Sequence, residues 1–157
     1  MCGDFFLGES MNKDNEFMEL AYQEALKALE IDEVPIGAII VQDGNIIAKS
    51  YNQREIEKQV KAHAEMLAIE QACRTLHSWR LDTCDIYVTL EPCLMCSGAI
   101  MQSRMQRVIF GAKSNRWLGL SNLIDTFSFN HYPIIIDGVL EEKCSKLLLQ
   151  YFRNKRH

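Results

Sequence analysis

The stretch "DIYVTLEPCLMCSGAIMQSRMQRVIFGA", residues 85–112, carries the main signal for the fold. It begins with a short apolar run at 85–90 and ends with another at 107–112, each of a length typical of a buried strand. The segment between them, 93–104, has the pattern of a helix. Parallel strands need a crossover connection, which is usually a helix, whereas a tight hairpin joins antiparallel strands. The helix between these two strands therefore predicts that they pair in parallel. The stretch therefore predicts a strand–helix–strand crossover of the kind found in α/β proteins.

The flanking segments extend this pattern in both directions. Residues 34–50, "VPIGAIIVQDGNIIAKS", predict two strands joined by an Asp43-Gly44 turn, which is a strong hairpin signal. The stretch "DNEFMELAYQEALKALE" predicts an amphipathic helix that begins at Asp14. The other predicted elements are helices over 62–76, 121–127 and 140–154 and a strand over 133–137. The order α-β-β-α-β-α-β-α-β-α predicts a three-layer α/β fold with a central five-stranded mixed sheet flanked by helices.

Length and composition predict one domain without a membrane segment. The chain has 157 residues, of which 48% are hydrophobic and 24% charged, and it contains no internal repeat. We expect a flexible N-terminus over residues 1–12 and a single domain over 13–157. No segment approaches the roughly 18–20 apolar residues of a membrane span. The first ten residues lack the basic start of a secretory signal, so a cytoplasmic protein with no membrane partner is expected.

The charge of the chain is unevenly distributed. Residues 1–100 hold 8 basic and 17 acidic side chains, whereas residues 101–157 hold 9 basic and 4 acidic ones. A basic C-terminal part is compatible with a polyanion such as a nucleic acid as partner. It is equally compatible with an ordinary solvated surface, so charge alone leaves both interpretations open.

Two of the six cysteines have the spacing of metal ligands. Cys93 and Cys96 share one face of the predicted helix, with Cβ atoms about 5–6 Å apart, which suits two corners of a tetrahedral zinc site. They lie at a helix N-terminus, where the dipole favours thiolates, and Pro92 fits the start of that helix. A redox pair and half of a four-thiolate zinc site are the alternatives. The chain has no second C-x-x-C to complete such a site, and the preceding elements are not in thioredoxin-like order.

The stretch "AHAEMLAIE" supplies a third candidate ligand and a candidate proton carrier. His63 lies at the start of a predicted helix, and two thiolates with one imidazole would leave a fourth zinc position open, as catalytic zinc requires. Glu65 points in a different direction from His63 and is a candidate general acid and base for zinc-activated water. The alternative for Glu65 is a solvated carboxylate in a first helical turn, which the helix dipole also favours.

These residues resemble a known family. "HAE" followed by "PCLMC" fits the H-x-E…P-C-x-x-C signature of zinc-dependent nucleobase deaminases, for which the tRNA-specific adenosine deaminases (TadA enzymes) are a standard example. The segments "EVPIGAIIVQDGNIIAKSYNQRE", "SWRL", "SRMQRVIFGA" and "DGVLEEKCSKLLLQYFR" are also similar to the bacterial tRNA-specific adenosine deaminases. The likeness covers about residues 13–155 and implies a cytidine deaminase-like fold.

The resemblance implies a reaction, a cofactor and partners. The reaction is hydrolytic deamination of the wobble adenosine of a tRNA anticodon loop to inosine, with release of ammonia. One Zn²⁺ per subunit would be held by His63, Cys93 and Cys96, while Glu65 moves protons. The implied partners are a tRNA anticodon stem-loop and a second copy of the chain in a homodimer.

The resemblance also implies substrate contacts. Asn52 and the Ala64 backbone would bind the flipped base, Ile36 would pack on it, and the Cys93 backbone N–H would stabilise charge on the reacting oxygen. The other residues implied at the substrate are Pro92, Arg54, Ser114, Asn130 and His131. The residues implied to meet the tRNA backbone are Arg153, Lys155 and Arg156.

The sequence departs from the family pattern on the expected RNA-facing loops. "KSNRWLGLSNLID" has Ser114 where the family commonly has an acidic or Asn-like residue, and Leu118 and Ser121 lie near expected glycines. "DTFSFNHYP" is short for the family, and the frequent Pro-Thr before Ala62 is missing. These departures affect RNA recognition and leave the zinc ligands unchanged.

Two further interpretations remain beside the tRNA-editing enzyme. One is a deaminase of a free nucleoside, nucleotide or nucleobase of the cytidine, deoxycytidylate or guanine type, which the basic C-terminal helix and the flanking matches disfavour. The other is a noncatalytic zinc-stabilised binding module, which would have no use for Glu65 at the open zinc position.

Overall fold

The helices and strands follow one another largely in the expected order. This computed structural model describes the backbone of residues 2–155 and the side chains of residues 13–155. The elements in chain order are α1 (Cys2–Glu30), β1 (Gly37–Gln42), β2 (Asn45–Tyr51), α2 (Arg54–Glu57), α3 (Ala64–Leu76), β3 (Cys84–Leu90), α4 (Leu94–Gln102), β4 (Arg107–Ala112), α5 (Leu120–Thr126), β5 (Ile134–Ile136) and α6 (Glu141–Lys155).

The five strands form one mixed sheet in the order β2-β1-β3-β4-β5. β1 pairs antiparallel with both β2 and β3, whereas β3, β4 and β5 are parallel to one another. The predicted crossover over residues 85–112 is therefore confirmed, with α4 joining parallel strands. At the expected hairpin turn Asp43 and Gly44 both have positive φ, 51° and 79°, as a type I′ turn requires.

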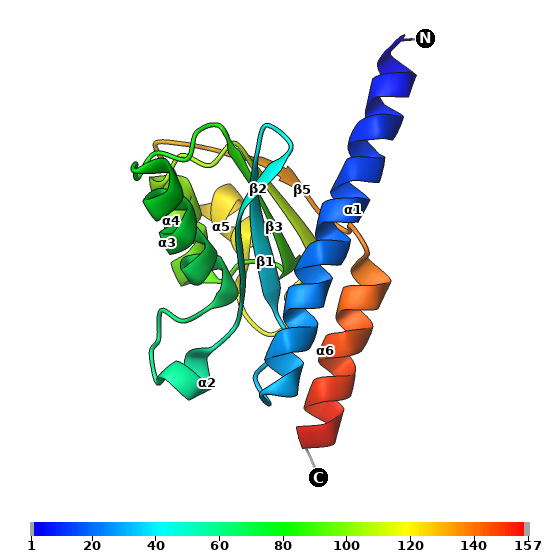
Figure 1. Cartoon of the computed structure of the whole chain (residues 1–157), viewed down its shortest axis with the longest axis vertical. Helices are drawn as coiled ribbons and strands as arrows, with labels where there is room; N and C mark the ends of the chain where they lie inside the picture. The colour runs from blue at the N-terminus through cyan, green and yellow to red at the C-terminus, as the bar shows by residue number, and fades with distance from the viewer. Residues whose placement is uncertain (1, 156–157) are drawn as a thin grey trace.

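Helices cover both faces of the sheet and make three layers. Figure 1 shows α1 and α6 on one face and α3, α4 and α5 on the other. Alternate strand residues supply the two cores because successive side chains of a strand point to opposite faces. In β1, for example, Ala38 and Ile40 belong to the core beneath α3 and α4, while Ile39 and Val41 belong to the core beneath α1. The expected three-layer α/β architecture with a five-stranded mixed sheet is confirmed.

The long first helix lies very close to β1, the strand between β2 and the central strand β3. Gly37 begins β1, and a Cβ atom at this position would overlap the Ala21 carbonyl oxygen and lie 2.5 Å from the Ala25 backbone nitrogen. Only glycine permits this approach of two backbones. The contact therefore fixes α1 against the start of β1.

The sequence-based start of α1 was wrong. The sequence predicts a helix that begins at Asp14, whereas α1 begins at Cys2. Asp14 is not a cap: it is 5% exposed, and its carboxylate accepts hydrogen bonds from the Tyr87 hydroxyl at 2.6 Å and from Arg107 at 3.1 and 3.2 Å. An acidic residue that would cap a helix if solvated is used here to join α1 to the sheet. The expected flexibility of residues 1–12 stays a prediction.

Two smaller differences concern short elements. The sequence-based reading contains no helix at α2, which has only four residues and no buried one. β5 has three residues instead of the five expected over 133–137. Among the helices of the described part of the chain, none has the length and hydropathy needed to cross a bilayer.

Candidate active site

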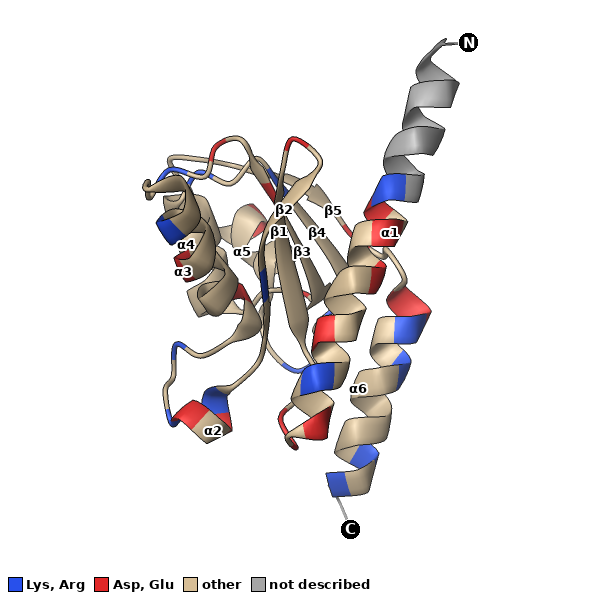
Figure 2. Cartoon of the chain, in the orientation of Figure 1, with Lys and Arg blue, Asp and Glu red and all other residues tan. Residues whose placement is uncertain are grey.

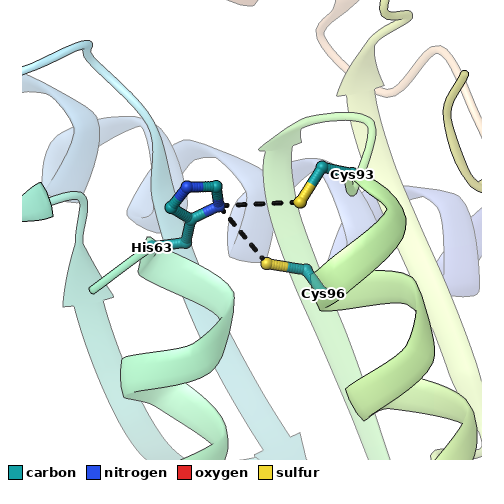
Figure 3. Close-up of side chains that lie close together, drawn as sticks. All are labelled: His63, Cys93 and Cys96. Carbon is teal, nitrogen blue, oxygen red and sulfur yellow. Dashed lines mark hydrogen bonds between the residues drawn. The ribbon is translucent and has the colours of Figure 1, made fainter. Parts of the chain in front are cut away.

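Two helix starts bring the three expected metal ligands together. His63 is the N-cap of α3 and Cys93 is the N-cap of α4, with Cys96 in the first turn of α4. The two helices lie side by side on one face of the sheet, so both N-termini open at the same edge (Figure 1). Figure 3 shows the imidazole of His63 pointing at the two sulfur atoms. Nδ1 of His63 is 3.6 Å from Sγ of Cys93 and 3.5 Å from Sγ of Cys96.

These distances fit a tetrahedral zinc ion. Zn–S bonds of about 2.3 Å and a Zn–N bond of about 2.0–2.1 Å at a tetrahedral angle place sulfur and nitrogen about 3.5–3.6 Å apart. All three ligand atoms lie within 4.8 Å of one another. Among the described residues, these side chains form the one group of three or more His, Cys, Asp or Glu that could hold a metal ion. Three protein donors leave a fourth position for a reactant, which is the pattern of catalytic rather than structural zinc.

The electrostatics of the three side chains also favour a cation between them. The pKa of Cys93 is lowered to about 4 because its sulfur accepts hydrogen bonds from the Cys96 thiol and from His63. The pKa of Cys96 is raised, chiefly because its thiol donates a hydrogen bond to the Cys93 sulfur and because it is buried, with the negative charges nearby adding to the shift. The pKa of His63 is raised by its contact with the Cys93 thiolate. A divalent ion would relieve the repulsion between two thiolates, so the donor set suits zinc chemically as well as geometrically.

Glu65 is buried beside this group. It lies in the first turn of α3 and is 4% exposed, so it is not the solvated carboxylate of the alternative interpretation. Burial raises its pKa from 4.5 to about 7. A buried carboxyl beside zinc ligands, and not itself one of the three, has the placement of a proton carrier.

Asn52 directly follows β2, and its side-chain amide is held in place by two hydrogen bonds. It is 7% exposed, its Nδ2 donates to the Val34 carbonyl at 3.3 Å, and its Oδ1 accepts from the Arg54 amide at 3.2 Å. Ser50 donates to the Ala64 carbonyl at 2.5 Å and so fixes the start of α3. Ile36 is half-buried and packs against the core on the α3 side. The structure thus brings Asn52, Ala64 and Ile36 to the neighbourhood of α3 and β1.

A buried carboxylate that the sequence-based reading missed holds the adjacent helix. Glu33 is 1% exposed, and its side chain accepts hydrogen bonds from the backbone amides of Glu55 at 2.9 and 3.1 Å and Ile56 at 3.3 Å. It therefore serves as the acceptor for the orphan amides at the start of α2, which has no cap of its own. Arg54, whose side chain is 56% exposed, is presented from this helix. No local sequence signal links Glu33 to residues that lie more than twenty positions away.

The loop that follows β4 is attached to the start of α4. Ser114 donates its backbone N–H to Glu91 at 3.1 Å, and its hydroxyl donates to the Trp117 carbonyl at 3.2 Å. Pro92 is buried, and its carbonyl accepts from the Leu120 amide at 3.1 Å. Ser114 and Pro92 are thus brought together near the zinc ligands.

The structure does not bring Asn130 and His131 close to the zinc ligands. Asn130 is exposed, and Nε2 of His131 is 2.7 Å from the carbonyl of Met105, two residues before β4. Since Cys93 follows the opposite, C-terminal end of the parallel strands, the imidazole is separated from the ligands by the length of β4. Contacts of these two residues with an RNA stay a prediction.

The basic side chains at the end of α6 differ in whether they are paired with an acidic residue. Figure 2 shows basic residues in the last turns of α6 beside the acidic end of α1. Lys155 is paired there with Asp32, while Arg153 is exposed. Arg156 lies outside the described residues.

Comparison with known proteins agrees with this site. Residues 11–112 match the cytidine and deoxycytidylate deaminase zinc-binding region. The chain is 48% identical over 149 residues to the tRNA-specific adenosine deaminase of Bacillus subtilis strain 168, covering 93% of this chain and 92% of the relative. A solved tRNA:A34 deaminase, studied for A-to-I editing at the wobble position, has 40% identity and a TM-score of 0.81 over 85% of this chain and 99% of its own.

A free-base deaminase of the same fold is more distant. The crystal structure of guanine deaminase from Bacillus subtilis has 31% identity and a TM-score of 0.62, covering 88% of this chain and 92% of its own. Both proteins share the fold of this chain, and the tRNA:A34 deaminase has the higher identity and the higher TM-score. The chain therefore belongs to the family of tRNA-specific adenosine deaminases, and its His63, Cys93 and Cys96 cluster fits the zinc site of that family.

Proposed function

We propose that this protein converts the wobble adenosine of a tRNA anticodon loop to inosine, with water as reactant and ammonia as the second product. The observation that carries the proposal is the placement of the buried Glu65 carboxyl beside a His63–Cys93–Cys96 donor set in a chain of this family. A binding module stabilised by zinc would gain nothing from burying a carboxylate there, since burial of an ionisable group is unfavourable.

The residues of the chain divide the chemistry between them. His63, through Nδ1, and the thiolates of Cys93 and Cys96 would hold zinc, which supplies a Lewis acid that activates water at neutral pH. A carboxylate oxygen of Glu65 accepts a proton from the attacking water and returns it to the purine as the C6–N bond breaks. Because Glu65 is buried, this proton is transferred within the site rather than to bulk water.

Substrate orientation is assigned to groups around the same edge. We propose that the Asn52 amide and the Ala64 backbone bind the edge of the flipped base and that Ile36 and Pro92 pack against it. We also propose that the Cys93 backbone N–H, at the N-terminus of α4, stabilises the negative charge that develops on the reacting oxygen. Arg54, Ser114, Asn130, His131, Arg153, Lys155 and Arg156 are proposed to contact the anticodon loop or the tRNA backbone.

The proposed assembly is a homodimer that acts on RNA in the cytoplasm. Apolar surface beside the site supports a second copy: Leu94, next to the ligand Cys93, is 68% exposed, and Leu118 is 62% exposed. Large exposed apolar side chains near a functional site are typical of interaction surfaces. Sedimentation of the purified protein measures the assembly, and a monomer at all concentrations would contradict it.

A substrate panel tests the function. The zinc-loaded protein is incubated with an anticodon stem-loop that carries adenosine at the wobble position, with the same stem-loop carrying guanosine there, and with free adenosine, cytidine and guanine. Mass analysis of nucleosides after nuclease digestion is expected to show inosine from the first stem-loop alone. Turnover of cytidine or guanine without RNA editing would overturn the proposal and move the chain to the small-molecule deaminases.

A further inference from the structure

Glu91 is a second buried carboxylate that the proposed chemistry does not use. It lies directly after β3, two residues before the ligand Cys93, and is 4% exposed. Its own backbone N–H donates to the Ala112 carbonyl at 2.8 Å, where β3 and β4 end together. Burying a charged group is costly unless it is fully hydrogen-bonded, so its partners indicate what it is for.

The partners of Glu91 lie at both ends of one loop, defined here as residues 113–121 and including the first two residues of α5. Oε1 accepts the backbone N–H of Ser114 at 3.1 Å, near the start of the loop. Oε2 accepts the backbone N–H of Ser121 at 2.8 Å and the Ser121 hydroxyl at 2.7 Å, at its end. One carboxylate therefore closes the loop with three hydrogen bonds, each strengthened by its charge.

The backbone of the loop fits closely around this carboxylate. A Cβ atom at Gly119 would overlap the Glu91 carboxyl carbon and lie 2.6 Å from Oε2. Leu120 donates its amide to the carbonyl of Pro92 at 3.1 Å, so the loop is joined to the residue between Glu91 and Cys93 as well. The loop is thus fastened to the same short segment that begins α4.

The last residues of the loop are also held by Leu120, which is buried in the core, whereas two further side-chain contacts of the loop lie on the surface. Lys113 pairs with Asp137 at 3.2 Å with both side chains about half exposed, and such pairs contribute about 0–1 kcal/mol. Arg116 lies over the ring of Phe152 at 4.3 Å, although Arg116 itself is exposed. Hydrogen bonds to a buried charge are stronger than either surface contact, so Glu91 is the main polar anchor of the loop.

We propose that Glu91 is a positioning residue: it holds the 113–121 loop, including Ser114, against the zinc-bearing start of α4 and so determines how tightly the anticodon loop is bound. The proposal rests on the proposed function for its kinetic consequence. Its structural part, an ordered loop held by a carboxylate, is independent of the substrate.

Glutamine is a sharp perturbation of this anchor. Both carboxylate oxygens accept hydrogen bonds from N–H groups, whereas a glutamine offers one oxygen and turns an NH₂ donor toward the other N–H. Two further substitutions test the same contact from the loop side, and a third serves as a control. Ser121→Ala removes one hydrogen bond, Gly119→Ala places a methyl group where the carboxylate lies, and Ser128→Ala, at an exposed serine beyond α5, is the matched control.

The first readout is the mobility of the loop, measured without substrate. Trp117 lies in the loop and is 49% exposed, and the chain has one other tryptophan, Trp79, which is 58% exposed. In a Trp79→Phe background, fluorescence anisotropy and acrylamide quenching report on Trp117 alone. Glu91→Gln and Gly119→Ala are expected to lower the anisotropy and increase quenching, while Ser128→Ala matches the parent. An unchanged Trp117 signal in both variants would overturn the proposal.

The second readout separates binding from chemistry on the zinc-loaded protein. Glu91→Gln and Ser121→Ala are expected to raise KM for the anticodon stem-loop about tenfold, the factor that corresponds to one hydrogen bond to a charged group. The kcat value and the zinc content should stay near those of the parent. Loss of zinc, or a fall in kcat at unchanged KM, would show that Glu91 serves the metal ligands instead and would overturn the proposal. If the parent protein edits no RNA, the Trp117 readout still decides whether Glu91 holds the loop.

Discussion

Arg107 joins three parts of the fold, and replacing it with methionine is expected to destabilise the protein strongly. Its guanidinium donates to both oxygens of Asp14 in α1, to the Tyr87 hydroxyl in β3 and, through Nε at 3.0 Å, to Asp85. The side chain is 19% exposed, and those of Asp14 and Asp85 are 7% and 20% exposed. Methionine retains most of the apolar stem and removes the charge, so two largely buried carboxylates lose their cation.

The expected loss of stability follows from leaving two carboxylates buried without their cation. Breaking a buried ion pair by removing one partner costs about 3–5 kcal/mol, because the remaining charge stays buried. Domains of this size are stable by about 5–15 kcal/mol, so the variant would lose a large fraction of its stability. Urea unfolding of zinc-loaded protein measures the loss. Arg74→Met is the matched control, since Arg74 is 76% exposed in its pair with Glu70 and such pairs contribute about 0–1 kcal/mol.

The penalty should depend on pH in a defined direction. Burial raises the pKa of Asp85 above its ordinary value, and Arg107 opposes that rise. Without Arg107 the folded-state pKa rises further, so the protonated carboxyl becomes the favoured folded form. Stability is then retained below the unfolded-state pKa of about 3.9 and lost as pH rises through the folded value. The difference between variant and parent is expected to be smaller at pH 5 than at pH 7.5. A loss below about 1 kcal/mol at pH 7.5, equal to that of Arg74→Met, would refute the reasoning.

Three other substitutions test the metal site, the packing of α1 and the α2 support. Cys96→Ala should abolish zinc binding, measured by inductively coupled plasma mass spectrometry. The control Cys144→Ala, at a buried cysteine in α6, should leave zinc binding intact. Zinc retained by Cys96→Ala would place the metal elsewhere. Gly37→Ala should lower the free energy of unfolding in urea by about 1–3 kcal/mol or more, because α1 must move. Gly98→Ala, where α4 has open space around the glycine, should instead raise it by about 0.4–1 kcal/mol. Equal effects of the two glycine variants would contradict the close approach of α1 to β1. Glu33→Ala should speed amide hydrogen exchange at Glu55 and Ile56 about fivefold, because losing a helix cap costs about 1 kcal/mol. The control Glu57→Ala should leave these exchange rates unchanged. Amides that stay protected in Glu33→Ala would exclude the capping role.

The zinc ligands were predictable because their signals are local. Cys93 and Cys96 are three positions apart at a strand-to-helix junction, and His63 starts another helix, so periodicity alone brings them to helix N-termini. Strand pairing was predictable for the same reason, since the hairpin turn and the helical crossover each fix the direction of neighbouring strands. The family resemblance then agreed with His63 as the third ligand.

The buried carboxylates were not predictable from the sequence. Asp14, Glu33 and Glu91 each look like solvated acids, and acidic residues are rarely buried unless paired. Their partners are distant: Asp14 bonds Tyr87 across 73 positions, Glu33 bonds Glu55 across 22, and Glu91 bonds Ser121 across 30. The start of α1 was misplaced for this reason, because Asp14 was read as a helix cap when it serves a tertiary contact. A four-residue helix such as α2 has too few positions for a periodic pattern.

The most direct test compares the parent protein with Glu65→Gln on the wobble-adenosine stem-loop, with zinc measured in the same samples. Glutamine fills the same buried space without carrying a proton, and Glu65 is outside the three-residue ligand group. The account predicts inosine at the wobble position from the parent, and a variant that binds zinc equally and turns over about 10²–10⁴-fold more slowly. A variant that retains zinc and forms inosine at the parent rate would contradict it.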